Sequence, residues 1–447
     1  MKRLAMILLL AAGCDAGYGG FLDTIPVVDQ HPDQPVQVFL GIDGLSRAAF
    51  DRARAAGAFQ DYSDANLVTF FPGVSDYSWM RLLHAGQTPG YEIQYYDPQR
   101  NTLLNPGIPG VIEHPLRQGV ADPLPCYRRF DFLGDGDLWT IYGYTNPEAA
   151  LPSTLDAMFN LLGARGRSQA VFLGYLMNVD VVSHHGGFDR AVAMLVEIDR
   201  RIREFQGRHP GRFTFTLIAD HGNAHQKAEL VDPSQLLREV GITPVEALGD
   251  PAALEAIPIV HVRVNFVSVH AAPGQRAEVA ARASRHRWVD LTAAPLEGDR
   301  FAVFKKGERY AFRRQADGSF LVEDAASWTA LGVSLPAGPD GNAQLRDDEA
   351  FAATVGGPYP DLFYRVATAF TDPTVKFPAD VILSLRDDVA SFGFHLPGTD
   401  DSLAVDGFHG ALSRASSLSV VASQSRSLPP VVRADDLRGL FPALASP

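Results

Sequence analysis

Two Asp–His pairs near the middle of the chain have the residue types that bind divalent metals. Asp180 and His184 follow one apolar run, and Asp220 and His221 follow the next one. Each run has the length and composition of a buried strand. In open α/β sheets, ligands bind beyond the carboxyl ends of the strands, where these four side chains would meet. The pairs therefore predict a metal site rather than core positions.

The segment between the pairs supplies the elements that would position them. The apolar runs 170–176 and 213–219 predict two strands. Between them, apolar residues recur at the spacing of one helix face: Phe188, Val192, Leu195, Val196, Ile198, Ile202 and Phe205. The predicted order is strand, polar loop, helix, strand and polar loop, which is a βαβ unit.

Three further groups stand at comparable positions. Asp43 ends the buried-strand run 36–42, Ser75 opens a helix after a Pro-Gly turn, and His409 lies in a glycine-rich loop. At a helix N-terminus, the Ser75 hydroxyl would lie where backbone N–H groups favour an anion. Each residue also fits an ordinary role: a helix cap for Asp43 and Ser75, and a polar surface position for His409.

Together these residues supply carboxylates, imidazoles and one hydroxyl: Asp43, Ser75, Asp180, His184, Asp220, His221 and His409. Two divalent ions about 4 Å apart can stabilise the attacking and the leaving oxygens of an in-line displacement at phosphorus. Such a site needs hard ligands and open positions for substrate. It also needs a hydroxyl that loses its proton easily, which metal coordination provides. The set therefore fits metal-assisted phosphoryl transfer.

The composition is that of a globular protein with an acidic surface. The chain has 447 residues, of which 46% are hydrophobic and 20% are charged. Its formal net charge of -13 argues against nucleic acid as the main partner, which would require a basic surface. Acidity remains compatible with phosphate chemistry, because bound divalent metals dominate the local field.

Residues 1–14 have the form of a secretion signal. Lys2 and Arg3 precede a short apolar core and small residues that end at Cys14, and the apolar run is too short to span a bilayer. The Leu-Ala-Ala-Gly-Cys ending resembles a bacterial lipoprotein signal, in which the cysteine is lipidated. Ala11 stands where leucine is most usual, so ordinary signal peptidase cleavage is the alternative. The sequence predicts an exported cell-envelope protein, in the periplasm or on the outer surface, that a lipid on Cys14 anchors to the membrane.

The remaining chain predicts an α/β fold with a mostly parallel sheet flanked by helices and an inserted α+β subdomain. The expected divisions are a linker at 15–35, a catalytic core at 36–242 and 366–447, and a cap-like insertion at 243–365. Within the insertion, residues 301–323 alternate like three short strands. The core is expected to resume near Tyr364, with a strand at 380–385. Cys126 alone would remain free once Cys14 is lipidated, so no intramolecular disulfide is expected.

The motifs together resemble the alkaline phosphatase superfamily, most closely its type I phosphodiesterase/nucleotide pyrophosphatase branch. Five pieces occur in the family's order and span nearly the whole mature chain outside the insertion. They are Asp43-Gly44, the Phe-Pro-x-x-Ser stretch ending at Ser75, Asp180-x-x-x-His184-x-x-Gly187, Asp220-His221-Gly222, and His409-Gly410. The resemblance implies an alkaline-phosphatase-like sheet and an enzyme that hydrolyses small phosphate esters.

The resemblance also implies a role for each matched side chain. The implied ligands form two groups: Asp180, His184 and His409 for one zinc ion, and Asp43, Asp220, His221 and the Ser75 oxygen for the other. Ser75 would be phosphorylated during turnover and then released by water. Zinc suits two histidine-containing sites, and manganese is the alternative.

The sequence departs from the family pattern just after the nucleophile. Many members carry Thr there, followed by Phe-Pro-Asn, whose Asn contacts a phosphoryl oxygen. Here Asp76 and Tyr77 come next, which leaves Ser78, Asn66 and Asn178 as candidate donors.

Three functions remain open from the sequence. The favoured one is an exported metal-dependent phosphohydrolase that acts on a phosphodiester or a phosphomonoester. The second is a sulfatase or phosphotransferase of the same superfamily, although Trp79 occupies the arginine position of the sulfatase pattern. The third is a catalytically silent surface lipoprotein, which the presence of all seven groups argues against. The tyrosines within 87–150 fit either a substrate cleft or half-buried packing.

Overall fold

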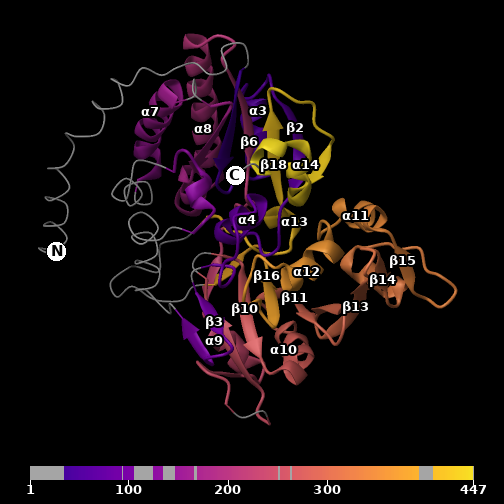
Figure 1. Ribbon diagram of the computed structural model, residues 1–447. Helices are drawn as coiled ribbons and strands as arrows, with labels where there is room; N and C mark the ends of the chain where they lie inside the picture. The colour runs from indigo at the N-terminus through magenta and orange to yellow at the C-terminus, as the bar shows by residue number, and fades with distance from the viewer. Residues whose placement is uncertain are drawn as a thin grey trace, which may run out of the picture.

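The computed structural model describes residues 35–92, 94–104, 124–133, 146–165, 169–249, 252–261, 264–391 and 406–445. These residues form two lobes, each built on its own sheet (Figure 1). The predicted signal peptide with Cys14, and all of the linker except residue 35, lie outside them. In the described part of the chain, no helix has the length and hydrophobicity needed to cross a membrane.

The first lobe contains a six-stranded sheet with the order β19-β2-β18-β6-β1-β5. Its strands are β1 (Val36–Ile42), β2 (Ser63–Val68), β5 (Val171–Leu176), β6 (Phe213–Ile218), β18 (Leu418–Ser423) and β19 (Val431–Arg433). β1 runs parallel to β5 and β6, and β19 runs parallel to β2. Only β18 runs antiparallel to its neighbours in this sheet. The predicted α/β class and mostly parallel core sheet are therefore confirmed.

The register of the three central strands brings their carboxyl ends to one level. Ile42 of β1 lies opposite Leu176 of β5, and Gly41 lies opposite Ile218 of β6. The residues that follow each strand therefore emerge at the same edge of the sheet, which is the edge that binds ligands in this class of fold.

Helices cover both faces of the core sheet (Figure 1). The helices of this lobe are α3 (Arg47–Ala55), α4 (Ser75–Leu82), α7 (Pro147–Arg165), α8 (Asn178–Arg208), α13 (Arg414–Ser417) and α14 (Leu437–Leu440). Val38 and Leu40 of β1 pack with α3, α7 and α8, whereas Phe39 packs in the cluster that contains α4 and α14. This alternation follows from the pleat of the strand, which points successive side chains to opposite faces.

The prediction of a polar loop after β5 was wrong, because α8 already begins at Asn178. The helix has non-helical dihedrals at Gly187 (φ 75°, ψ −174°), so the segment before this kink is a short separate helical stretch. Asp180 and His184 lie on it. Residues four apart share one helix face, so helical geometry itself aligns these two side chains.

The second lobe contains a nine-stranded sheet with the order β15-β14-β13-β12-β11-β16-β10-β9-β8. Its strands are β8 (Thr243–Pro244), β9 (Glu255–Ile259), β10 (Phe266–Ala271), β11 (Val289–Pro295), β12 (Arg300–Lys305), β13 (Glu308–Arg314), β14 (Phe320–Val322), β15 (Ala343–Leu345) and β16 (Val381–Leu385). The accompanying helices are α9 (Pro233–Glu239), α10 (Arg276–Ala283), α11 (Asp347–Val355) and α12 (Leu362–Thr371). The predicted three-stranded meander within 301–323 is confirmed as β12, β13 and β14.

The strand predicted at 380–385 forms as β16, but it does not return the chain to the core sheet. It pairs with β10 and β11 in the second sheet. All five of its residues are buried and four of them are apolar, and such a strand does not show in its sequence which strands it pairs with. The chain re-enters the core sheet only at β18.

Two short ladders and several 3₁₀ helices complete the described structure. The ladders pair β3 (Tyr95–Asp97) with β4 (Thr102–Leu104), and β7 (Glu229–Val231) with β17 (Val389–Ser391). The 3₁₀ helices are η1 (Tyr127–Arg129), η2 (Pro273–Gln275), η3 (Ala325–Leu331), η4 (Ala434–Asp436) and η5 (Pro442–Ala445).

Candidate metal centre

The seven residues singled out from the sequence lie together at the carboxyl edge of the core sheet. Asp43 follows β1, Asp220 and His221 follow β6, and Asp180 and His184 lie on the first turns of α8. Ser75 begins α4, and His409 comes from the loop that precedes α13. All but Ser75 are buried, and Ser75 is partly exposed.

The six acidic and imidazole side chains form two groups of three. One group is Asp180, His184 and His409, and the other is Asp43, Asp220 and His221. Within each group, the potential ligand atoms all lie within 4.8 Å of one another. In the first group, Asp180 Oδ2 is 2.9 Å from His184 Nε2, and Asp180 Oδ1 is 3.9 Å from His409 Nε2.

The second group also contains the Ser75 hydroxyl. His221 Nε2 is 3.1 Å from Asp43 Oδ1 and 3.6 Å from Asp220 Oδ2. Ser75 Oγ donates to Asp43 Oδ1 at 3.2 Å and lies 3.3 Å from His221 Nε2. The two groups adjoin each other, because the His221 and His409 rings stack with centroids 3.6 Å apart.

Each histidine of the centre is oriented through the nitrogen that faces away from the carboxylates. In every case Nδ1 contacts a backbone carbonyl, which can only accept, so Nδ1 carries the hydrogen and Nε2 faces the group. The three acceptors are Gly407 O for His184 (2.6 Å), Gly222 O for His221 (2.9 Å) and Gly73 O for His409 (2.9 Å).

The carboxylates of Asp43 and Asp220 are also held by hydrogen bonds. Asp220 Oδ1 accepts from the backbone N–H groups of Gly44 (3.2 Å) and His221 (3.0 Å). Asp43 Oδ2 accepts from the Tyr175 hydroxyl at 2.6 Å. These bonds fix one oxygen of each carboxylate and leave the other directed at His221.

Gly44 is required by the close approach of its loop to Asp180. It adopts φ +64°, and a Cβ at this position would lie 2.5 Å from Asp180 Oδ1. Both its backbone conformation and the available space therefore favour glycine.

Two carboxylate oxygens in the centre have no hydrogen-bond partner. They are Asp180 Oδ1 and Asp220 Oδ2, one in each group. A buried acceptor without a partner is costly, and a cation in each group would satisfy it. The donor set of carboxylates and imidazoles also matches what zinc and similar divalent ions bind. The residues present therefore fit two divalent metal ions.

The electrostatics of the centre point the same way. Burial and the nearby Asp43 carboxylate raise the pKa of Asp220 to about 7, and burial together with Asp180 raises the pKa of Asp43. Burial opposes a charge on His221, but Asp220 and Asp43 outweigh it and raise the pKa of His221 to about 10. The crowded carboxylates thus favour a positive charge beside them. A metal ion would replace the proton on His221, since both neutralise the same groups.

The alternative helix-cap roles of Ser75 and Asp43 are not adopted. The N-cap of α4 is Val74, so Ser75 is the first helical residue and its hydroxyl faces Asp43 and His221. The N-cap of α3 is Ser46, whose hydroxyl accepts from the backbone N–H of Ala49 at 3.1 Å.

The three candidate donors to a phosphoryl oxygen have different surroundings. The Asn178 amide donates to the Pro147 carbonyl at 3.2 Å, and Asn66 lines a separate pocket. The Ser78 hydroxyl is buried, one helical turn after Ser75, and has no hydrogen-bond partner. Of the three, Ser78 thus lies near Ser75 and has a hydroxyl that is not committed to another partner.

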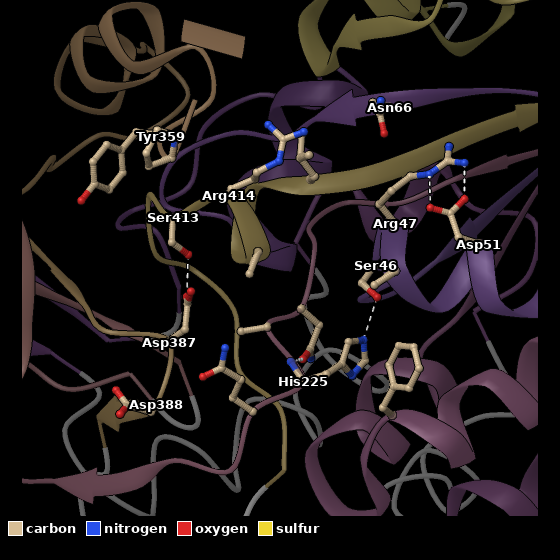
Figure 2. Close-up of a pocket in the computed structure, with 18 of the residues that line it drawn as sticks. Ser46, Arg47, Asp51, Asn66, His225, Tyr359, Asp387, Asp388, Ser413 and Arg414 are labelled. Atoms are coloured by element: carbon tan, nitrogen blue, oxygen red, sulfur yellow. Dashed lines mark hydrogen bonds and ion pairs between the residues drawn. The ribbon is translucent and has the colours of Figure 1, made fainter. Parts of the chain in front are cut away.

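The pocket that contains Asn66 has a volume of about 1540 Å³ and is shown in Figure 2. None of the seven residues of the metal centre lines it. Its polar groups largely pair with one another: Arg47 with Asp51, Arg386 with Asp388, Ser46 with His225 and Ser413 with Asp387. It offers no comparable set of convergent ligands among the residues that line it.

The tyrosines of the loop region mostly serve packing where the structure describes them. Tyr91, Tyr96 and Tyr127 are buried, and their hydroxyls donate to Ala369 O, Asn101 Oδ1 and Asp76 Oδ1 respectively. Tyr142 and Tyr144, for which the sequence left a substrate cleft and half-buried packing open, lie outside the described residues.

Sequence reasoning missed Tyr175 as a partner of the centre. Its hydroxyl reaches Asp43 because β5 pairs with β1, with Tyr175 directly opposite Gly41. The signal in the sequence is only a polar aromatic residue next to the end of an apolar strand. It identifies Tyr175 as a partner of Asp43 only when the pairing of β5 with β1 is known.

Residues 74–339 match the family model for type I phosphodiesterase/nucleotide pyrophosphatase. This match includes Ser75, Asp180, His184, Asp220 and His221, and leaves Asp43 and His409 outside it. No curated protein matches the chain.

The solved structures that are similar to the chain include the following two. Phosphonoacetate hydrolase from Sinorhizobium meliloti 1021 in complex with phosphonoacetate has 15% identity and a TM-score of 0.48, over 94% of this chain and 96% of that one. Human ectonucleotide pyrophosphatase/phosphodiesterase 5 has 11% identity and a TM-score of 0.43, over 93% and 96%.

Proposed function

Because the chain belongs to the type I phosphodiesterase/nucleotide pyrophosphatase family of the alkaline phosphatase superfamily, we propose that it hydrolyses small phosphate esters with two metal ions and a Ser75 nucleophile. Members of this family are metal-dependent phosphoric ester hydrolases. The observation that carries the proposal is the pair of adjoining three-ligand groups with the Ser75 hydroxyl 3.2 Å from Asp43.

In this proposal, each group holds one ion: Asp180, His184 and His409 the first, and Asp43, Asp220, His221 and the Ser75 oxygen the second. Bound divalent ions would lower the pKa of the Ser75 hydroxyl and offset charge on the phosphoryl oxygens. Zinc suits the mixed carboxylate and imidazole ligands, with manganese as the alternative.

The protein's own groups then divide the reaction into two displacements. Ser75 gives up its proton and its Oγ attacks phosphorus, the P–O bond to the leaving group breaks, and the leaving oxygen takes up a proton as the serine phosphoester forms. Water then attacks the same phosphorus, and Ser75 leaves with a proton. Tyr175 holds Asp43 in place, and the Nδ1 contacts keep the three imidazoles oriented throughout.

Metal removal tests this proposal. The purified protein is dialysed against a chelator and assayed with bis(p-nitrophenyl) phosphate and p-nitrophenyl phosphate, before and after zinc or manganese is restored. We expect kcat to fall on the order of 10³-fold without metal and to recover with it, since the ions supply several kcal/mol of charge stabilisation. Full activity after complete metal removal would contradict the proposal. The better substrate distinguishes a diesterase from a monoesterase.

We also propose that the protein is exported and anchored to a membrane through a lipid on Cys14. The support is the sequence of residues 1–14, which has the charge, apolar core and terminal cysteine of a lipoprotein signal. Cys14→Ala in the full chain is expected to leave the enzyme in the soluble fraction after cell breakage, with kcat unchanged. Cys126→Ala is the matched control, because that thiol is buried and free in the folded protein. Equal membrane retention of wild type and Cys14→Ala would contradict the anchor.

A further inference from the structure

Arg365 is a buried cation at the junction of the two lobes. It lies on α12, which Figure 1 shows between the core sheet and the second sheet, and it is 2% exposed. Its guanidinium lies over the Phe71 ring, 5.7 Å from the centroid. The residue therefore reaches from the second lobe into the segment that precedes Ser75.

Besides one hydrogen bond to Pro360 O at 3.2 Å on its own segment, Arg365 donates to the two segments that adjoin Ser75 and His409. One nitrogen donates to Phe70 O at 3.0 Å, at the start of the segment that leads into α4. The other donates to Ser417 Oγ at 2.6 Å and to Leu412 O at 3.4 Å, just after the His409 loop. Arg365 thus holds both loops with one planar group.

The same two loops meet inside the metal centre. Gly73 O, two residues before Ser75, accepts from His409 Nδ1 at 2.9 Å. Thr69 Oγ1 donates to Ser417 O at 3.0 Å, and Ser417 Oγ in turn donates to Leu412 O at 3.0 Å. A shift of either loop would therefore move Ser75 relative to His409, which belongs to the other ligand group.

Arg365 differs from Arg433, a half-buried arginine nearby, in having no carboxylate partner within ion-pair distance among the described residues. Asp361, one turn earlier on the chain, accepts instead from Arg433 Nε at 2.7 Å. A buried cation without such a partner is costly to fold. Hydrogen bonds offset this cost, because the planar guanidinium donates to several acceptors at fixed angles at the same time.

We propose that Arg365 is a positioning residue for phosphoryl transfer, which fixes the Ser75 loop against the His409 loop and couples the second lobe to the centre. This inference rests on the proposed function. A displacement of about 1 Å at a reacting group can cost about 10²-fold in rate, so loosening these loops lowers kcat without removing any substrate contact.

Arg365→Lys tests the inference, since lysine keeps the charge but cannot reach both Phe70 O and Ser417 Oγ with one nitrogen. We expect kcat to fall about 10- to 100-fold, with KM changed less than about threefold and metal content equal to wild type. Arg433→Lys is the matched control: a half-buried arginine at the same junction, whose ion pairs go to Asp361 and Asp347. It is expected to lower the melting temperature and leave kcat near wild type.

Wild-type kcat in Arg365→Lys, or an equal loss of kcat in both variants, would overturn the inference. If Arg365→Lys does not fold, Ser417→Ala removes one acceptor only and is expected to lower kcat by a smaller factor, again with little change in KM. Ser417→Ala with unchanged kcat would then overturn it. Wild-type hydrolysis in the same assay separates the two questions: an inactive, metal-loaded wild type counts against the proposed function, whereas an active one with unaffected variants counts only against Arg365.

Discussion

Ser75→Ala is expected to lower kcat for phosphate ester hydrolysis by at least about 10³-fold, as removal of a catalytic nucleophile does in other enzymes. The reason is the position of the hydroxyl, 3.2 Å from Asp43 Oδ1 and 3.3 Å from His221 Nε2, at the N-terminus of α4. Alanine favours the helix, so folding and metal content should be retained. Steady-state kinetics measure the fall in kcat, and elemental analysis of the same preparation measures the metal content.

Ser78→Ala provides the comparison within the same helix. Its hydroxyl is buried and has no hydrogen-bond partner. If it only donates a hydrogen bond to a phosphoryl oxygen, the loss of kcat in Ser78→Ala should be smaller than in Ser75→Ala. Full activity in Ser75→Ala would move the nucleophile elsewhere. If kcat fell as much in Ser78→Ala as in Ser75→Ala, the assignment of Ser75 as the attacking serine would no longer be supported.

Asp180→Ala is expected to reduce the metal content from two ions to one and to lower kcat on the order of 10³-fold. Asp180 contacts both histidines of its group, and without it only two ligands remain, fewer than the three protein ligands that catalytic zinc sites use. The lost ion removes several kcal/mol of charge stabilisation. Elemental analysis and kinetics check the two parts of the expectation.

Asp51→Ala is the control for removing an aspartate. Asp51 pairs with Arg47 on the surface and is 53% exposed in its side chain, where such pairs contribute little to stability. Its metal content and kcat should match wild type. Two bound ions with normal turnover in Asp180→Ala would contradict the assignment of the first group.

The gathering of the metal-centre side chains at one sheet edge can be predicted from the sequence, because it follows simple rules. A strand that ends in a polar residue places that residue at the sheet edge, and the two strands of the predicted βαβ unit run parallel, so Asp180, His184 and Asp220 come to one edge without knowledge of distant contacts. The spacing of Asp180 and His184 supplies a helical pair even though a loop was expected there.

The parts that sequence reasoning missed depend on pairings between distant segments. The run 381–385 has the same apolar character as the core strands, and only its partners β10 and β11 place it in the second sheet. Tyr175 and Arg365 likewise gain their roles from residues 132 and 295 positions away, Asp43 and Phe70. The periodicity of apolar residues predicts which side chains are buried, but it does not predict which strand or side chain they contact.

The most direct test of the account is mass spectrometry of the protein after an acid quench during turnover of bis(p-nitrophenyl) phosphate. We predict a phosphoryl ester on the peptide that contains Ser75 in the wild type, and no such ester in Ser75→Ala. An active wild type that shows no adduct at Ser75 under conditions where release is slowed, or an adduct on another residue, would contradict the proposed mechanism.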